Sequence, residues 1–101
     1  MAHFALKLNP PRPTFALDMS EEEVVLMQEH AGYCGALLQQ GGAVVFGPVM
    51  DPKGPYGLGI AEFADERAAR VFADNDPAIK AGRGFSYEIN PMQAMTRDSA
   101  P

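Results

Sequence analysis

In the stretch Phe72-Ala73-Asp74-Asn75-Asp76-Pro77-Ala78-Ile79-Lys80-Ala81-Gly82, a helical pattern of apolar residues is interrupted by a proline. A residue that precedes proline is disfavoured in the α region, so the helix must end near Asp76. Residues 78–82 can form one further short turn before the chain extends again at Phe85. Asp76 is therefore expected at a sterically fixed corner, a position that suits a site better than an open surface.

Four strands and two helices surround this corner. Apolar and polar residues alternate at residues 3–8, 56–63 and 85–90, and a short β-rich run covers residues 43–49. Ser20 and Glu23 have the spacing of a capping box, which predicts a helix from there to the glycines at 41–42. Asp65 caps a second helix that ends at Asn75. Helical spacing predicts a core stripe on the first helix, made of Val24, Met27, Ala31, Cys34 and Leu38.

The order of elements, β-α-β-β-α-β, predicts an α+β protein with the ferredoxin-like split arrangement. Both helices then cover one face of a four-stranded antiparallel sheet. Its other face is left bare, and a second copy of the chain is the simplest cover, so we expect a homodimer. Residues 1–92 form one domain, in which residues 9–19 are a proline-rich loop insert with Phe15 and Leu17 tucked against the body. Residues 93–101 form a polar C-terminal tail.

Composition excludes several classes of function. The net charge is −5 and the eight Lys and Arg residues are scattered, which argues against a nucleic-acid partner. Cys34 is the sole cysteine, so no intrachain disulfide is possible, and two histidines are too few for an ordinary zinc site in one chain. No apolar run is long enough to cross a membrane, and no signal peptide is apparent. These features favour a cytoplasmic protein.

Three segments together resemble the YciI-like (YCII-related) domain family. They are a helical histidine within Met27-Gln28-Glu29-His30-Ala31-Gly32-Tyr33, the run Val45-Phe46-Gly47-Pro48-Val49, and the corner at residues 75–82 followed by Tyr87-Glu88-Ile89. The resemblance covers residues 20–92 and also suits the first strand. The proline-rich insert and the extended tail depart from the short form of the family.

The resemblance implies a dimeric α+β barrel of ferredoxin-like protomers, with a histidine and an aspartate as the active-site pair. By motif position these are His30 and Asp76. A relative in chloroaromatic degradation eliminates chloride from a chlorinated hydroxyhydroquinone. The insert could form the rim of the pocket, or it could only lengthen a loop.

The resemblance favours a small enzyme of the lyase or hydrolase type that uses neither cofactor nor metal. His30 would be the general base and Asp76 its orienting partner, acting on a small hydroxylated or aromatic molecule. Tyr33 and Tyr56 are weaker candidates for substrate contacts. Two alternatives stay open: a non-catalytic small-molecule-binding or accessory homodimer, or a pair that serves stability alone. Cys34 is more simply a buried packing residue than a nucleophile.

Overall fold

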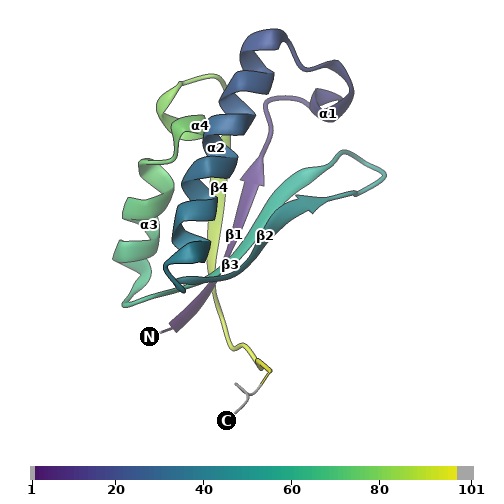
Figure 1. Ribbon diagram of the computed structural model, residues 1–101. Coiled ribbons are helices and arrows are strands. Elements are labelled where there is room, and N and C mark those ends of the chain that lie inside the picture. The colour runs from purple at the N-terminus through teal and green to yellow at the C-terminus, as the bar shows by residue number, and fades with distance from the viewer. Residues whose placement is uncertain (1, 98–101) are drawn as a thin grey trace.

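The computed structural model describes residues 2–97 and confirms the predicted α+β class. In chain order the elements are β1 (Ala2–Asn9), α1 (Phe15–Asp18), α2 (Glu21–Gln39), β2 (Ala43–Val49), β3 (Tyr56–Phe63), α3 (Glu66–Asp74), α4 (Pro77–Lys80) and β4 (Ser86–Met92). The strands form an antiparallel sheet in the order β2-β3-β1-β4, as in the ferredoxin-like fold. Figure 1 shows α2, α3 and α4 together on one side of this sheet.

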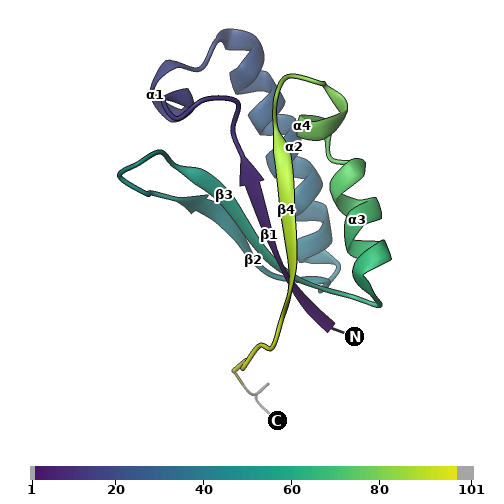
Figure 2. The ribbon, with the colours of Figure 1, turned by 180° about the vertical axis from the view of Figure 1, so that it is seen from behind.

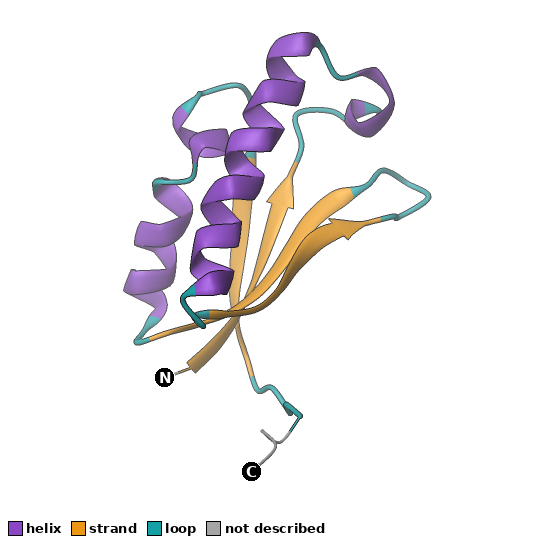
Figure 3. Ribbon diagram, viewed as in Figure 1, coloured by secondary structure: helices purple, strands orange, loops and turns teal. Residues whose placement is uncertain are grey.

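Two features differ in detail from the sequence-based expectation. The insert contains a one-turn helix, α1, visible at the end of the molecule beyond α2 (Figure 3). Strand β4 continues through Pro91, which an edge strand tolerates because its outer side needs no ladder hydrogen bond. The expected tail has no regular structure at residues 93–97, and its last residues, 98–101, lie outside the described part of the chain.

The core lies between the sheet and the helices. Phe4 and Leu6 of β1 pack with Ala61, Phe63 and Ala69, and all five are buried. A row across the sheet runs from Phe46 through Gly59 and Leu6 to Ile89. A Cβ atom at Gly59 would lie 2.2 Å from the Phe46 ring, so the glycine makes room for this aromatic side chain.

The opposite face of the sheet has no helix over it among the described residues (Figure 2). The strand registers place Val45, Ile60 and Ala5 side by side on this face, and the next row contains Leu58. Val45 is 52% exposed. The predicted bare and partly apolar face is therefore present.

The core stripe predicted for α2 is wrong at three of its five positions. Cys34 is buried and Met27 half-buried, but Val24, Ala31 and Leu38 are exposed. The helix is rotated so that Leu26 and the capping residue Glu23 face the interior in their place. Ala31 and Leu38 instead line an open cavity, which is described below.

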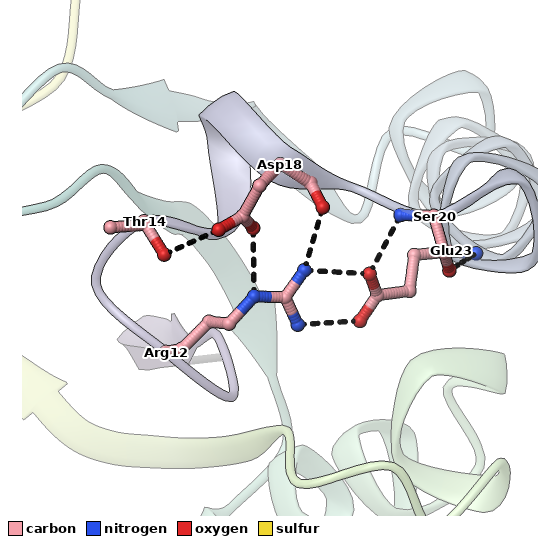
Figure 4. Close-up of polar contacts among 5 residues, drawn as sticks. All are labelled: Arg12, Thr14, Asp18, Ser20 and Glu23. Atoms are coloured by element: carbon pink, nitrogen blue, oxygen red, sulfur yellow. Dashed lines mark hydrogen bonds and ion pairs between the residues drawn. The ribbon is translucent and has the colours of Figure 1, made fainter.

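A network centred on Arg12 attaches the insert to the start of α2 (Figure 4). Its guanidinium donates two hydrogen bonds, of 2.8 and 2.9 Å, to the Glu23 carboxylate and a third, of 2.7 Å, to Asp18. Thr14 donates to the same Asp18 side chain, and the predicted capping box joins Ser20 to Glu23. The insert is thus an ordered part of the domain.

Aromatic packing holds the other side of the insert. Phe15 is buried and makes an edge-to-face contact with Phe85, with ring centroids 5.2 Å apart. The expectation that Leu17 is also tucked in is wrong, because Leu17 is 90% exposed. Two positions along a single helical turn point to nearly opposite sides, so only one of the two residues can face the body.

Candidate active site

The helical histidine and the corner aspartate, which lie 46 positions apart in sequence, meet in space. Nδ1 of His30, in the middle of α2, is 2.7 Å from Oδ2 of Asp76. The Asp76 side chain is fully buried and that of His30 is 19% exposed. The two residues that the family resemblance pairs are therefore in hydrogen-bond contact.

The corner itself fixes the aspartate. Asp76 has extended backbone angles and is the N-cap of α4, and Pro77 occupies the first helical position. Its Oδ1 accepts a hydrogen bond of 2.9 Å from the backbone N–H of Ala78. Its Oδ2 accepts a second hydrogen bond, of 2.6 Å, from the hydroxyl of Tyr87 in addition to that of His30. Three residues thus hold one sealed carboxylate in a single orientation.

These contacts keep the pair ionised. Burial by itself would raise the pKa of Asp76, but the hydrogen bonds from His30, Tyr87 and Ala78 outweigh burial, and the pKa lies below its ordinary value. Burial likewise opposes the charged form of His30, yet Asp76 and then Cys34 raise the His30 pKa to about 9. A pKa of about 9 favours the imidazolium form of His30 at neutral pH.

A cavity of about 540 Å³ lies between the sheet and α2, and His30 forms part of its wall. Tyr87 and Cys34 also line it, whereas Asp76 lies behind His30 and does not reach it. The insert supplies one side of this cavity through Phe15 and Met19. The structure therefore supports the view that the insert forms the rim of the pocket and does more than lengthen a loop.

Cys34 lies one helical turn after His30, but its sulfur is poorly placed to exchange a proton with the ring. The Sγ atom is 3.8 Å from Nδ1 and 3.9 Å from Nε2. A sulfur aligned with the lone pair of one ring nitrogen would lie clearly closer to that nitrogen than to the other. The thiol is 3% exposed. This arrangement agrees with a packing role for Cys34.

His30, Cys34 and Asp76 are also the one group of potential metal ligands found among residues 2–97, with ligand atoms within 4.8 Å of one another. Two ligands on a tetrahedral Zn²⁺ at about 2.0 Å lie about 3.3 Å apart. The separation of 2.7 Å between Nδ1 and Oδ2 is that of a hydrogen bond. The three side chains are arranged as a proton-sharing pair with an adjacent thiol.

The two tyrosines suggested by the sequence occupy different places. Tyr56 lines the cavity. Tyr33 does not line it: its hydroxyl donates a 2.7 Å hydrogen bond to the carbonyl of Phe72, and the two rings stack. Tyr87 is the residue that sequence reasoning missed, although it lies within the segment that carries the family resemblance. The alternation at residues 85–90 predicted only a strand, and the contact of Tyr87 with Asp76 depends on the path of the turn before it.

The described residues include no helix that is both long enough and apolar enough to cross a bilayer. Together, the ferredoxin-like sheet and the His–Asp pair beneath α2 define a small α+β domain with a candidate acid/base site. The family model of the YCII-related domain matches residues 4–93, so the chain belongs to the YCII-related domain family. No curated protein was found to match it.

Proposed function

We propose that this domain is a small enzyme of the lyase or hydrolase type that uses His30 and Asp76 for proton transfer. The observation that carries the proposal is the 2.7 Å hydrogen bond between a sealed carboxylate and an imidazole at the wall of a ligand-sized cavity. Pockets of this volume accommodate small organic molecules. The substrate is expected to be a small hydroxylated or aromatic compound.

The raised His30 pKa supports a specific order of proton transfer. Because the resting imidazole is protonated, His30 acts first as a general acid that donates its Nε2 proton to the substrate or leaving group. It then acts as a base when it takes a proton back. Asp76 fixes the tautomer and stabilises the imidazolium throughout. Neither step requires a cofactor.

A turnover assay tests this proposal. The purified protein is incubated with halogenated hydroxyaromatic compounds and with activated esters, and halide release or hydrolysis is followed. For any substrate that reacts, kcat/KM should fall as pH rises through about 9, because His30 then loses its proton. Asp76→Asn should move this decline to lower pH. Unchanged turnover in a folded His30→Gln variant would refute the catalytic role.

The alternative is a non-catalytic binding or accessory domain in which the same pair anchors a ligand. The apolar cavity wall supports this alternative, because it carries few groups that could assist a reaction. Saturable ligand binding that depends on His30, combined with no turnover across the substrate panel, would support it.

We also propose that the domain is a cytoplasmic homodimer. The uncovered sheet face supports a dimer, because Val45 and Met92 on this face are 52% and 41% exposed and Ile60 lies beside Val45. A single free thiol suits a reducing compartment. Light scattering after gel filtration measures the mass. A dimer that Ile60→Glu converts to a folded monomer supports this interface, and a monomeric wild-type protein refutes it.

A further inference from the structure

The wall of the cavity carries a single basic side chain, that of His30. Among the residues that line it there is no Asp, Glu, Lys or Arg within the described part of the chain. His30 is the exception to this neutral wall. Its counter-ion, Asp76, is fully buried on the far side of the ring. A molecule in the cavity therefore meets the positive end of the ion pair and is shielded from the negative end.

The imidazolium has one hydrogen-bond donor to offer. Nδ1 of His30 is committed to Asp76, and for Nε2 the described residues provide no oxygen or nitrogen partner. The nearby Cys34 sulfur, at 3.9 Å, is a weak acceptor. The Nε2–H of His30 is therefore available to donate a charged hydrogen bond to an oxygen atom of a ligand in the cavity.

The remainder of the cavity suits an apolar ring or short chain. The inner face of the sheet contributes Leu6 and Phe46, α2 contributes Met27 and Leu38, and the insert contributes Phe15 and Met19. Gly57 and Gly59 of β3 leave the floor free of side chains of their own. A volume of about 540 Å³ leaves room for one small molecule.

We propose that this cavity is a binding site for small organic acids, with the ligand carboxylate on Nε2 of His30 and its apolar body between the sheet and the insert. The inference rests on the proposed function in that it names the ligand class of the same site. A carboxylate is the stronger partner than a neutral carbonyl group, because hydrogen bonds between ionised partners are roughly twice as strong as neutral ones. An amine would place a second positive charge beside the imidazolium.

The experiment compares benzoate with benzamide, two probes that share a ring and differ in charge. Each is titrated into ¹⁵N-labelled protein at neutral pH, and the His30 imidazole and the amides of Gly57 and Gly59 are followed by NMR. We expect benzoate to shift all three signals and to bind about tenfold more tightly than benzamide, since one charged hydrogen bond exceeds a neutral one by about 1.4 kcal/mol. In His30→Gln, benzoate should bind no better than benzamide.

A matched pair of variants at Met19 keeps the test valid if the substitution at His30 disturbs folding. Met19 lines the cavity and is 37% exposed, so polar side chains can be accommodated there. Met19→Glu adds a negative charge to the wall and should weaken benzoate binding severalfold, whereas Met19→Gln should not. Benzamide should bind both variants equally.

The outcomes separate this inference from the proposed function. Equal affinity for benzoate and benzamide overturns the acid preference and leaves proton transfer by His30 and Asp76 untouched. Absence of binding by both probes at millimolar concentration overturns the cavity as a site for small acids. Tight benzoate binding without turnover of any compound supports this inference while the enzymatic proposal fails.

Discussion

Helix α2 is held by two hydrogen-bonded ion pairs that differ in their access to water. Near its first turn, Glu23 accepts two hydrogen bonds from Arg12 of the insert, and the Arg12 side chain is 36% exposed. Two turns further on, His30 meets Asp76, whose side chain is fully buried. The two pairs have similar contact distances, but the exposed partner of the first pair is the charged Arg12, with Glu23 10% exposed, whereas in the second pair the carboxylate is fully buried and His30 is 19% exposed.

This difference in solvent access determines what each pair can do. Water and salt reach the charges of Arg12 and Asp18, so this network serves mainly to position the insert beside the cavity. The Asp76 carboxylate is sealed from water, and its contact with His30 raises the His30 pKa to about 9. Similar hydrogen-bond geometry thus produces an attachment point in one place and a candidate proton donor in the other.

The largest expected effect comes from removing the buried carboxylate. Asp76→Ala leaves the His30 charge, the Tyr87 hydroxyl and the Ala78 amide without their partner, and should lower the free energy of unfolding by about 3–5 kcal/mol. The matched variant in the exposed network, Asp18→Ala, should cause a much smaller loss, because water replaces the lost contacts of Arg12. Urea denaturation measures both, and equal losses would contradict the distinction between the two pairs.

A smaller effect is expected from removing single tyrosine hydroxyls. Tyr87→Phe deletes a 2.6 Å hydrogen bond to an ionised carboxylate and should cost about 1.5–3 kcal/mol. Tyr33→Phe deletes a 2.7 Å hydrogen bond to a neutral carbonyl, that of Phe72, and should cost about 0.5–1.5 kcal/mol. Thermal unfolding of the two variants, measured side by side, shows which substitution lowers the stability more. A larger loss in Tyr33→Phe would show that the carboxylate gains little from its third partner.

The smallest effect concerns salt. Arg12→Gln should destabilise the wild-type fold slightly at low ionic strength, and the difference should shrink as NaCl is added, because the exposed pair is screened. The loss in Asp76→Ala should persist in the same titration. A loss in Arg12→Gln that does not depend on salt would indicate that packing of Arg12 on Phe15, 5.3 Å away, matters more than its charge.

The sequence predicts the fold well and the site in part. Capping residues, alternation and the proline at position 77 are local signals, and they locate the strands and helices to within a few residues. The pairing of His30 with Asp76 came from the family resemblance, because no local pattern reports a contact across 46 positions. Tyr87 and the Arg12 network depend on the paths of two turns, which short-range patterns do not specify.

The pKa of His30 depends on the burial of Asp76 beside it, and no local sequence pattern reports that burial. An imidazole ordinarily titrates near neutral pH, and a carboxylate partner makes it more basic, which led to the role of general base. The sealed carboxylate of Asp76 raises the His30 pKa to about 9, which supports the proposal that the ring acts first as a general acid.

An NMR titration of the His30 imidazole tests this account most directly. The folded-state pKa lies above the ordinary value of 6.5, so His30 contributes stability that is fully present below pH 6.5 and is lost as pH rises through about 9. We predict a titration midpoint near 9 in the wild-type protein and a clearly lower one in Asp76→Asn. A wild-type midpoint at or below 6.5 would contradict the account, because Asp76 would then fail to hold the imidazole in its charged form.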